Sequence, residues 1–305
     1  MSHILLKSIL VESRLYSYTT KELLEKLLTF KGKTLVFLDT EVAGLEPNVS
    51  YVQLTQLAAA AFDGDTMKLI GEFAEKAKLG WALTKALNDP ESNGAKNIER
   101  LRQKYLKRYK DKHTDPTVPG YPTDDEILKK AGFMHPKDVL AMTNYYSSPA
   151  SMDEGTVLLH FQAFLRKFPN VVLIIHNATF DMKVIQARLK KNKLPPLNRY
   201  PVIDTVKISR FFFIPILQAI EHSDPEAKAY LEQLVAKTKF KSYASSLGKL
   251  AAVFDIKAGG WHDAKEDITM LFQLLSKFVE FLEINQNIDI RQYQGAQAKR
   301  LRKVK

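Results

Sequence analysis

Two carboxylates, Asp39 and Glu41, stand one residue apart at the end of an apolar run that begins at Thr34. Side chains alternate across an extended strand, so both would point to the same face, one pleat apart. Like charges held that close repel each other unless a cation neutralises them, and hard cations such as Mg²⁺ or Mn²⁺ prefer carboxylate oxygens. The pair is therefore compatible with a metal site, but acidic residues at a solvated strand end would have the same pattern, and the pair alone favours that second interpretation.

A further acidic residue, Asp181, closes the segment His-Asn-Ala-Thr-Phe-Asp at 176–181, which follows the apolar run 171–175. Ligands gather at the carboxyl ends of strands in α/β folds, so this placement is typical of a binding site. The alternatives are that Asp181 only stabilises the N-terminus of a following helix and that Asn177 is only a turn former.

A third segment runs from His262 to Asp267 and follows two consecutive glycines. Asp263 and Glu266 have the spacing of a capping pair, which predicts a helix with Asp267 in its first turns. On a straight helix His262 and Asp267 would point apart, so they converge only if His262 lies on the entry loop, which the glycines permit. A surface histidine and an ordinary acidic helix start are the alternatives.

The elements that must position these residues alternate along the chain. Apolar and β-prone runs predict strands at 34–41, 51–62, 67–79, 171–175 and 202–203. Helical periodicity predicts helices at 155–168, after Asp181, after Asp204 and at 263–282. The first three strands suggest an antiparallel meander, and the whole order predicts an α/β fold with helices on the faces of the sheet.

Residues 80–150 interrupt this order with several prolines and are expected to form an inserted lobe. Within it, a basic helix is predicted near residues 98–109. Its Tyr105 and Tyr109 interleave with Lys and Arg, which would suit backbone tracking and base stacking along a single strand, and a solvated helix face explains the tract nearly as well. The net charge of +11 also favours an anionic partner such as nucleic acid.

The composition excludes several classes of protein. A chain of 305 residues with 45% hydrophobic content can bury a sizeable core, so disorder of the whole chain is not expected. The absence of cysteine excludes disulfides, Cys-ligated zinc and thiol catalysis. No apolar run is long enough to cross a bilayer and no secretory signal is recognisable, so a cytoplasmic protein without a membrane partner is expected.

The three acidic segments also occur in a particular order: Asp-x-Glu on a first strand, His-Asn-x-x-Phe-Asp after a later strand, and His-x-Ala-x-x-Asp at a last helix. In this order the chain resembles the DEDDh 3′-5′ exonucleases, the group that includes the proofreading epsilon subunit of bacterial DNA polymerase and ribonuclease T. The resemblance covers about residues 33–280, apart from the inserted lobe, with further landmarks at 51–54, 202–205 and 246–250. It implies a ribonuclease-H-like mixed sheet flanked by helices.

The resemblance also implies an activity, the release of nucleotides from the 3′ end of nucleic acid with two Mg²⁺ ions, for which Mn²⁺ would substitute. His262 would be the general base, because an imidazole accepts a proton near neutral pH. The metal ligands would be Asp39, Glu41, Asp181 and Asp267. The residues expected at the terminal nucleotide are Thr40, Val42, Asn177 and Phe180.

One position departs from the family pattern. Many members have threonine and glycine directly after the glutamate, whereas here Val42-Ala43-Gly44 follows Glu41. A backbone N–H of Val42 would have to replace any contact that a threonine side chain makes to the terminal 3′-hydroxyl.

Three functions and one domain organisation follow from these observations. Single-stranded DNA is favoured as the substrate; an exoribonuclease would differ only in how it receives the 2′-hydroxyl, and a silent nucleic-acid-binding protein would keep the fold without the chemistry. The expected organisation is an N-terminal helical extension at 1–32, an exonuclease domain at 33–283 with an insertion at about 80–150, and a basic C-terminal tail at 284–305.

Overall fold

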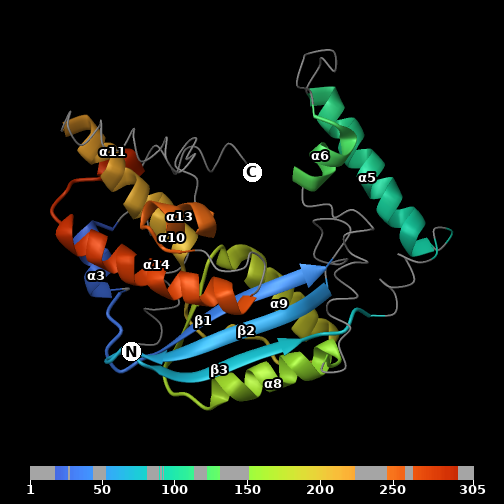
Figure 1. Cartoon of the computed structure of the whole chain (residues 1–305), viewed down its shortest axis with the longest axis horizontal. Coiled ribbons are helices and arrows are strands. Elements are labelled where there is room, and N and C mark those ends of the chain that lie inside the picture. Colours follow the sequence, from blue (N-terminus) through green and yellow to red (C-terminus); the bar gives the residue numbers. More distant parts are fainter. Residues whose placement is uncertain are drawn as a thin grey trace.

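One twisted sheet with helices on both faces forms the body of the molecule in the computed structural model (Figure 1). The structure describes residues 18–26, 28–43, 53–80, 89, 91, 93–112, 122–130, 151–223, 246–257 and 264–294. Among these residues, no helix combines the length and the apolar character that crossing a membrane requires.

The sheet has five strands in the order β3-β2-β1-β4-β5. The strands are β1 (Thr34–Ala43), β2 (Gln53–Asp63), β3 (Leu69–Lys76), β4 (Val171–Ile175) and β5 (Val202–Asp204). The antiparallel meander of β1, β2 and β3 is confirmed, and β4 and β5 run parallel to β1. This mixed sheet with its flanking helices has the ribonuclease-H-like arrangement, so the predicted fold class is confirmed.

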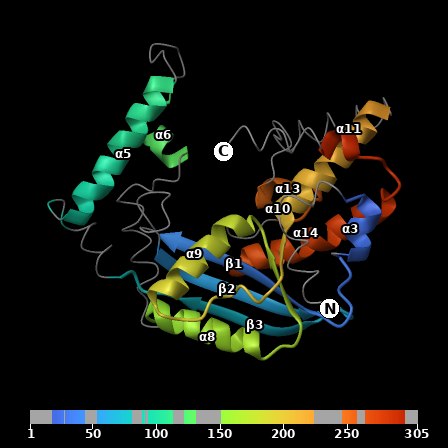
Figure 2. The same ribbon diagram turned by 180° about the vertical axis from the view of Figure 1, so that it is seen from behind.

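Helices cover the two faces of the sheet unequally (Figures 1 and 2). One face carries α8 (Glu154–Arg166) and α9 (Ala178–Lys191). The helices whose side chains share the other core are α3 (Thr20–Lys26), α10 (Thr205–Ile208), the π-helical turn η2 (Ser209–Phe213), α11 (Ile214–Ser223), α13 (Leu247–Val253) and α14 (Ala264–Ile284).

The central strand β1 explains how both faces are filled. Leu35 and Phe37 belong to the core under α14, while Val36 and Leu38 belong to the core under α8 and α9. All four side chains are completely buried, as expected for a strand that is covered on both sides. Because side chains alternate, the residues that follow Leu38 are directed in turn to the α14 face and to the α9 face.

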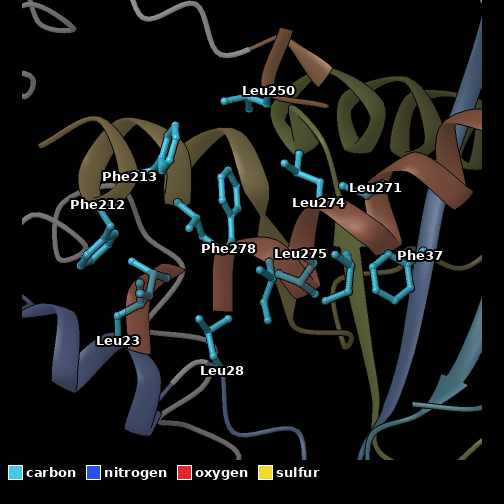
Figure 3. Close-up of a cluster of buried hydrophobic side chains, with 14 of the residues drawn as sticks. Leu23, Leu28, Phe37, Phe212, Phe213, Leu250, Leu271, Leu274, Leu275 and Phe278 are labelled. Carbon is cyan, nitrogen blue, oxygen red and sulfur yellow. The ribbon is translucent and has the colours of Figure 1, made fainter. Parts of the chain in front are cut away.

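The core on the α14 face joins segments that are far apart in the sequence. Figure 3 shows Leu274 and Phe278 of α14 among side chains from other helices, including Leu23, Phe213 and Leu250. Leu23 is completely buried although it lies in the predicted N-terminal extension. The described part of that extension, α3, is therefore an integral part of the main core.

The predicted C-terminal tail also begins inside the packed structure. Gln294 is completely buried, and its Nε2 donates hydrogen bonds to the backbone carbonyls of Tyr18 (3.1 Å) and Phe211 (2.9 Å). Ile290 is buried as well. Residues up to 294 thus belong to the folded body, and only residues 295–305 of the predicted tail lie outside the described part of the chain.

Two described helices, α5 (Asn93–Lys112) and α6 (Asp124–Lys130), lie in the predicted insertion. They pack on each other through a small cluster of Leu106, Ile127 and Leu128. Tyr105 and Tyr109 are half-buried against the same cluster. The two tyrosines therefore serve the packing of the lobe, which corrects the expectation that they stand among the basic side chains for base stacking.

Candidate active site

Three of the predicted acidic residues meet at the carboxyl end of β1. Asp39 and Glu41 are directed to the α14 face, and Asp267 lies in the first turn of α14. One carboxylate oxygen from each of the three lies within 4.8 Å of the others. The sheet and the amphipathic helix α14 thus bring together residues that are more than 220 positions apart in the chain.

The fourth acidic residue, Asp181, approaches from the opposite face of the sheet. It lies in the first turn of α9 and is only 4% exposed. Thr40, which alternation directs to this face, donates a hydrogen bond from its Oγ1 to Oδ1 of Asp181 at 2.6 Å. Thr40 is itself buried, so in this structure its side chain positions a carboxylate and does not face solvent.

Burial and the neighbouring carboxylates raise the pKa values of Asp39 and Asp181. The pKa of Asp39 is raised to about 8, first by burial and then by the nearby charges of Asp181, Asp267 and Glu41. Burial also raises the pKa of Asp181 to about 7, although the hydrogen bond from Thr40 acts in the opposite direction. Without a counter-cation, this site therefore favours bound protons near neutral pH.

A hard divalent cation fits this donor set. All the candidate ligand atoms are carboxylate oxygens, which Mg²⁺ and Mn²⁺ prefer over softer metals. The raised pKa of Asp39 shows that the charged form of the cluster lacks compensation, and a cation would supply it. The residues that could hold such ions are Asp39, Glu41 and Asp267, with Asp181 beside them.

Asp204 organises the neighbouring strand ends. Its Oδ1 accepts hydrogen bonds from the backbone N–H of Val206 (3.0 Å), which caps α10, and from that of Asn177 (3.2 Å), which precedes α9. Asn177 has a left-handed backbone with φ of 65°, a conformation that asparagine tolerates better than most residues. Asp204 thus fixes the start of the helix that carries Asp181. From the sequence, Asp204 was indicated only as part of the segment 202–205, which resembles a landmark of the family.

Of the other predicted site residues, some lie near this cluster and one falls outside the residues that the structure describes. Phe180 precedes Asp181 in α9, and its ring is 39% exposed. Val42 is half-buried where the β1–β2 register shifts, and such bulges commonly redirect side chains near functional sites. Asn177 is exposed. His262, the predicted general base, lies outside the described residues.

Comparisons with known proteins give matches among solved structures alone. No family model and no curated protein matches the chain. Cell-death related nuclease 4 aligns with 14% identity and a TM-score of 0.44, over 82% of this chain and 64% of that protein.

Solved structures of exonuclease I also align with this chain. A product-bound structure has 13% identity and a TM-score of 0.46, over 83% of this chain and 45% of that one. The E. coli enzyme in complex with a dT13 oligonucleotide has 14% identity and a TM-score of 0.46, over 81% and 41%. The chain spans less than two thirds of the length of each of these proteins.

Proposed function

We propose that this protein is a metal-dependent 3′-5′ exonuclease that releases nucleotides from the free 3′ end of single-stranded DNA. The observation that supports the proposal is the approach of Asp39, Glu41 and Asp267 within 4.8 Å of one another. Stability alone does not explain this approach, because three like charges at a strand end and a helix start repel each other. A site that binds divalent cations does explain it.

Each acidic residue has a distinct part in the proposal. Asp39, Glu41 and Asp267 bind cations with their clustered oxygens, and Asp181, oriented by Thr40, completes the ligand set from the other face. The two bound cations would supply positive charge that stabilises the oxygens of the reacting phosphate. His262, two residues before α14 in the sequence, accepts the proton of the attacking water.

The terminal nucleotide is proposed to lie against the start of α9. The exposed ring of Phe180, next to the ligand Asp181, offers a face on which a base can stack. Asn177 offers an exposed amide at the same helix start, and Val42 lies beside Glu41 at the bulge of the sheet. Thr40 is buried and does not contact the nucleotide in this proposal; it orients Asp181 through its hydrogen bond.

The proposal is tested by a timed digestion of DNA and RNA oligomers that carry a label at the 5′ end, in Mg²⁺ and in EDTA. The expected result is a ladder that shortens from the 3′ end in Mg²⁺, with mononucleotide products, and no change in EDTA. Matched DNA and RNA substrates identify the preferred sugar. Products that shorten from the 5′ end, or a protein that leaves every substrate intact in Mg²⁺ and Mn²⁺, would overturn the proposal.

Substitutions tie the activity to the cluster. Asp39→Asn and Asp267→Asn each remove one charged ligand with little change in shape, so each is expected to lower turnover by at least about a thousandfold. Glu283→Gln is a matched control, because Glu283 is an exposed acidic residue at the far end of the same helix as Asp267. Full activity in either Asp variant would show that the hydrolysis belongs to another site or to a contaminant.

A further inference from the structure

The helix α5 has two faces of opposite character. The face toward α6 carries Leu106 with the half-buried Tyr105 and Tyr109. With 3.6 residues per turn, the opposite face collects most of the exposed basic residues of the helix and one acidic residue, Asp111, at its end. We call this surface the α5 basic face; it consists of Lys96, Arg100, Lys104, Lys107 and Arg108.

Internal ion pairs do not neutralise the middle of this face. The ion pairs described in the lobe involve cations nearer its edges and ends, as in Lys110 with Asp124 (2.7 Å) and Lys96 with Glu91 (2.8 Å). Within the part of the chain that the structure describes, Lys104, Lys107 and Arg108 have no ion pair or side-chain hydrogen bond. Their charges are therefore available to an external anion.

The lobe is attached at the end of the sheet where β1 and β3 finish, which is also the end that carries the candidate site. It leaves the body after β3 and returns before α8, and the two stems pair in a parallel bridge between Ala77 and Met152. The register places Lys76 of β3 opposite Gln56, which lies opposite Glu41. Two strand spacings, about 10 Å, therefore separate the end of β3 from Glu41. Both views show α5 standing off from the sheet beyond this end (Figures 1 and 2).

The spacing of the cations suits an extended polyanion. From Lys96 to Arg108 the face runs for about 18 Å along the helix, at 1.5 Å per residue. Because the aromatic side chains of α5 face the other way, the helix offers charge without a stacking platform. Such a surface would contact phosphates and leave the bases unread.

We propose that the α5 basic face binds the sugar-phosphate backbone of the same single strand whose 3′ end enters the candidate site, several nucleotides upstream of that end. This assignment rests on the proposed exonuclease function for the identity of the strand. The contact is electrostatic, so it strengthens binding of long strands of any sequence and does not reach very short ones. Neutralising the face raises the Kd for long strands and weakens the salt dependence of that Kd.

Binding of fluorescent oligomers in EDTA tests the proposal, because a metal-dependent activity cannot shorten the probe there. The variant Lys104→Gln/Lys107→Gln/Arg108→Gln removes the three cations that lack internal partners, and glutamine preserves helix propensity. The Kd for a strand of about 30 nucleotides is expected to rise at least about tenfold, and the slope of log Kd against log salt to fall by about 2, at 0.7 per lost phosphate contact on a single strand. The Kd for a trinucleotide is expected to stay the same.

Two further variants separate charge from structure. The control Lys68→Gln/Arg166→Gln/Lys167→Gln removes the same charge from exposed residues before β3 and at the end of α8, at the end of the sheet away from the lobe, and is expected to bind long strands nearly as the parent does. Lys104→Arg/Lys107→Arg keeps the charge and is expected to keep the affinity. Equal losses in the two triple variants, or an unchanged Kd in the α5 variant, would overturn the assignment.

The failure of this inference can be told apart from failure of the proposed function. If the parent protein binds long strands through α5 but digests none in Mg²⁺, the exonuclease proposal fails and the binding face stands. If it digests strands and the α5 variant binds and digests them as the parent does, the binding face is wrong and the exonuclease proposal stands.

Discussion

At the scale of single residues, Thr40 decides how Asp181 is held. The hydroxyl of Thr40 reaches Oδ1 of Asp181 at 2.6 Å near the carboxyl end of the central strand β1. A hydroxyl that donates to a carboxylate favours its charged form, so this hydrogen bond keeps the pKa of Asp181 lower than burial alone would set it. Thr40 therefore links the strand that carries Asp39 to the helix on the other face.

Thr40→Val is expected to lower turnover and cation affinity about tenfold and to destabilise the fold by about 1–3 kcal/mol, because the buried carboxylate loses its donor. The pKa of Asp181 should rise, so half-maximal activity should shift to higher pH. Thr40→Ser keeps the hydroxyl and should behave much more like the parent. Activity profiles against pH and denaturant titrations measure both effects; identical profiles for the Val and Ser variants would contradict the role.

Asp39 gives the metal-free fold a distinct pH dependence. Its pKa is about 8 in the folded chain, against an ordinary value of 3.8, so the folded state binds a proton that the unfolded state has released. This contribution to stability is complete below about pH 4 and is lost as the pH rises towards 8. A bound cation should remove the loss, since it compensates the charged form.

The prediction compares the parent with Asp39→Asn, which imitates the protonated side chain. In EDTA at about pH 8 the variant should melt a few degrees higher than the parent, on the order of 2–4 °C for each kcal/mol recovered. Mg²⁺ should raise the melting temperature of the parent and have much less effect on the variant. A variant that melts lower than the parent in EDTA at this pH would contradict the burial argument.

The order of the acidic motifs along the chain, through the family resemblance that it carries, predicted three residues of the cluster, Asp39, Glu41 and Asp267, whereas each local pattern alone left a structural alternative open. The partner of Asp181 was not predictable in this way. Thr40 and Asp181 are 141 positions apart, and either could face solvent in an isolated element. Only the packing of α9 against the sheet makes them neighbours.

At the scale of elements, an ion pair joins α8 and α9. Arg188 donates from Nε and Nη2 to the two oxygens of Glu154, both at 2.7 Å. Glu154 also accepts from the backbone N–H of Leu54 in β2 at 3.1 Å. Arg188 is only 4% exposed, so the pair is shielded from solvent. The Glu154 carboxylate therefore links α8, α9 and β2 on the face of the sheet where Asp181 lies.

Arg188→Met is expected to cost about 3 kcal/mol, because Glu154 would keep a shielded charge without its bidentate partner. Replacing both residues with Met should recover part of the loss, since burying two apolar side chains avoids the isolated charge. Urea titrations of the parent, the single variant and the double variant measure this difference. A double variant no more stable than Arg188→Met would show that the hydrogen bond to Leu54 dominates.

The strands were predicted well where the local pattern is strong. The apolar run 171–175 coincides with β4, and the run at 34–41 falls within β1, because a central strand buried on both faces leaves a continuous apolar signature. The faces of α5 were harder to assign. Tyr105 and Tyr109 follow a basic pattern in the sequence, and only the contact with α6 shows that they face inward.

At the scale of the whole molecule, Gln294 holds the two ends of the described chain together. Its side-chain amide bridges the backbone of Tyr18, before α3, and that of Phe211, in η2. Neither the placement of α3 in the core nor this bridge was predictable from the sequence, since both depend on contacts between segments more than 80 positions apart. The polar composition near the C-terminus instead suggested a solvated tail.

Gln294→Leu is expected to destabilise the fold by about 1–3 kcal/mol, because the buried carbonyl of Phe211 and the partly buried carbonyl of Tyr18 lose their donor. Hydrogen exchange should increase in α3 and η2 more than in the strands of the sheet. Gln286→Leu serves as the control, since Gln286 lies in the same C-terminal segment and makes an exposed contact. Equal protection of α3 in the parent and the Gln294 variant would show that the apolar contacts of Leu23 are sufficient.

The paired stems of the lobe have a consequence for how such a chain can be changed. Neighbouring strands lie about 5 Å apart, but the bridge between Ala77 and Met152 is parallel, so a linker that replaces the lobe must cross back to the second stem and needs about a dozen residues. Everything between these two residues can in principle be cut out and rejoined without moving any strand of the sheet. The lobe is thus an exchangeable cassette, and chimeras spliced at this bridge could transfer it to other nucleases built on a similar sheet.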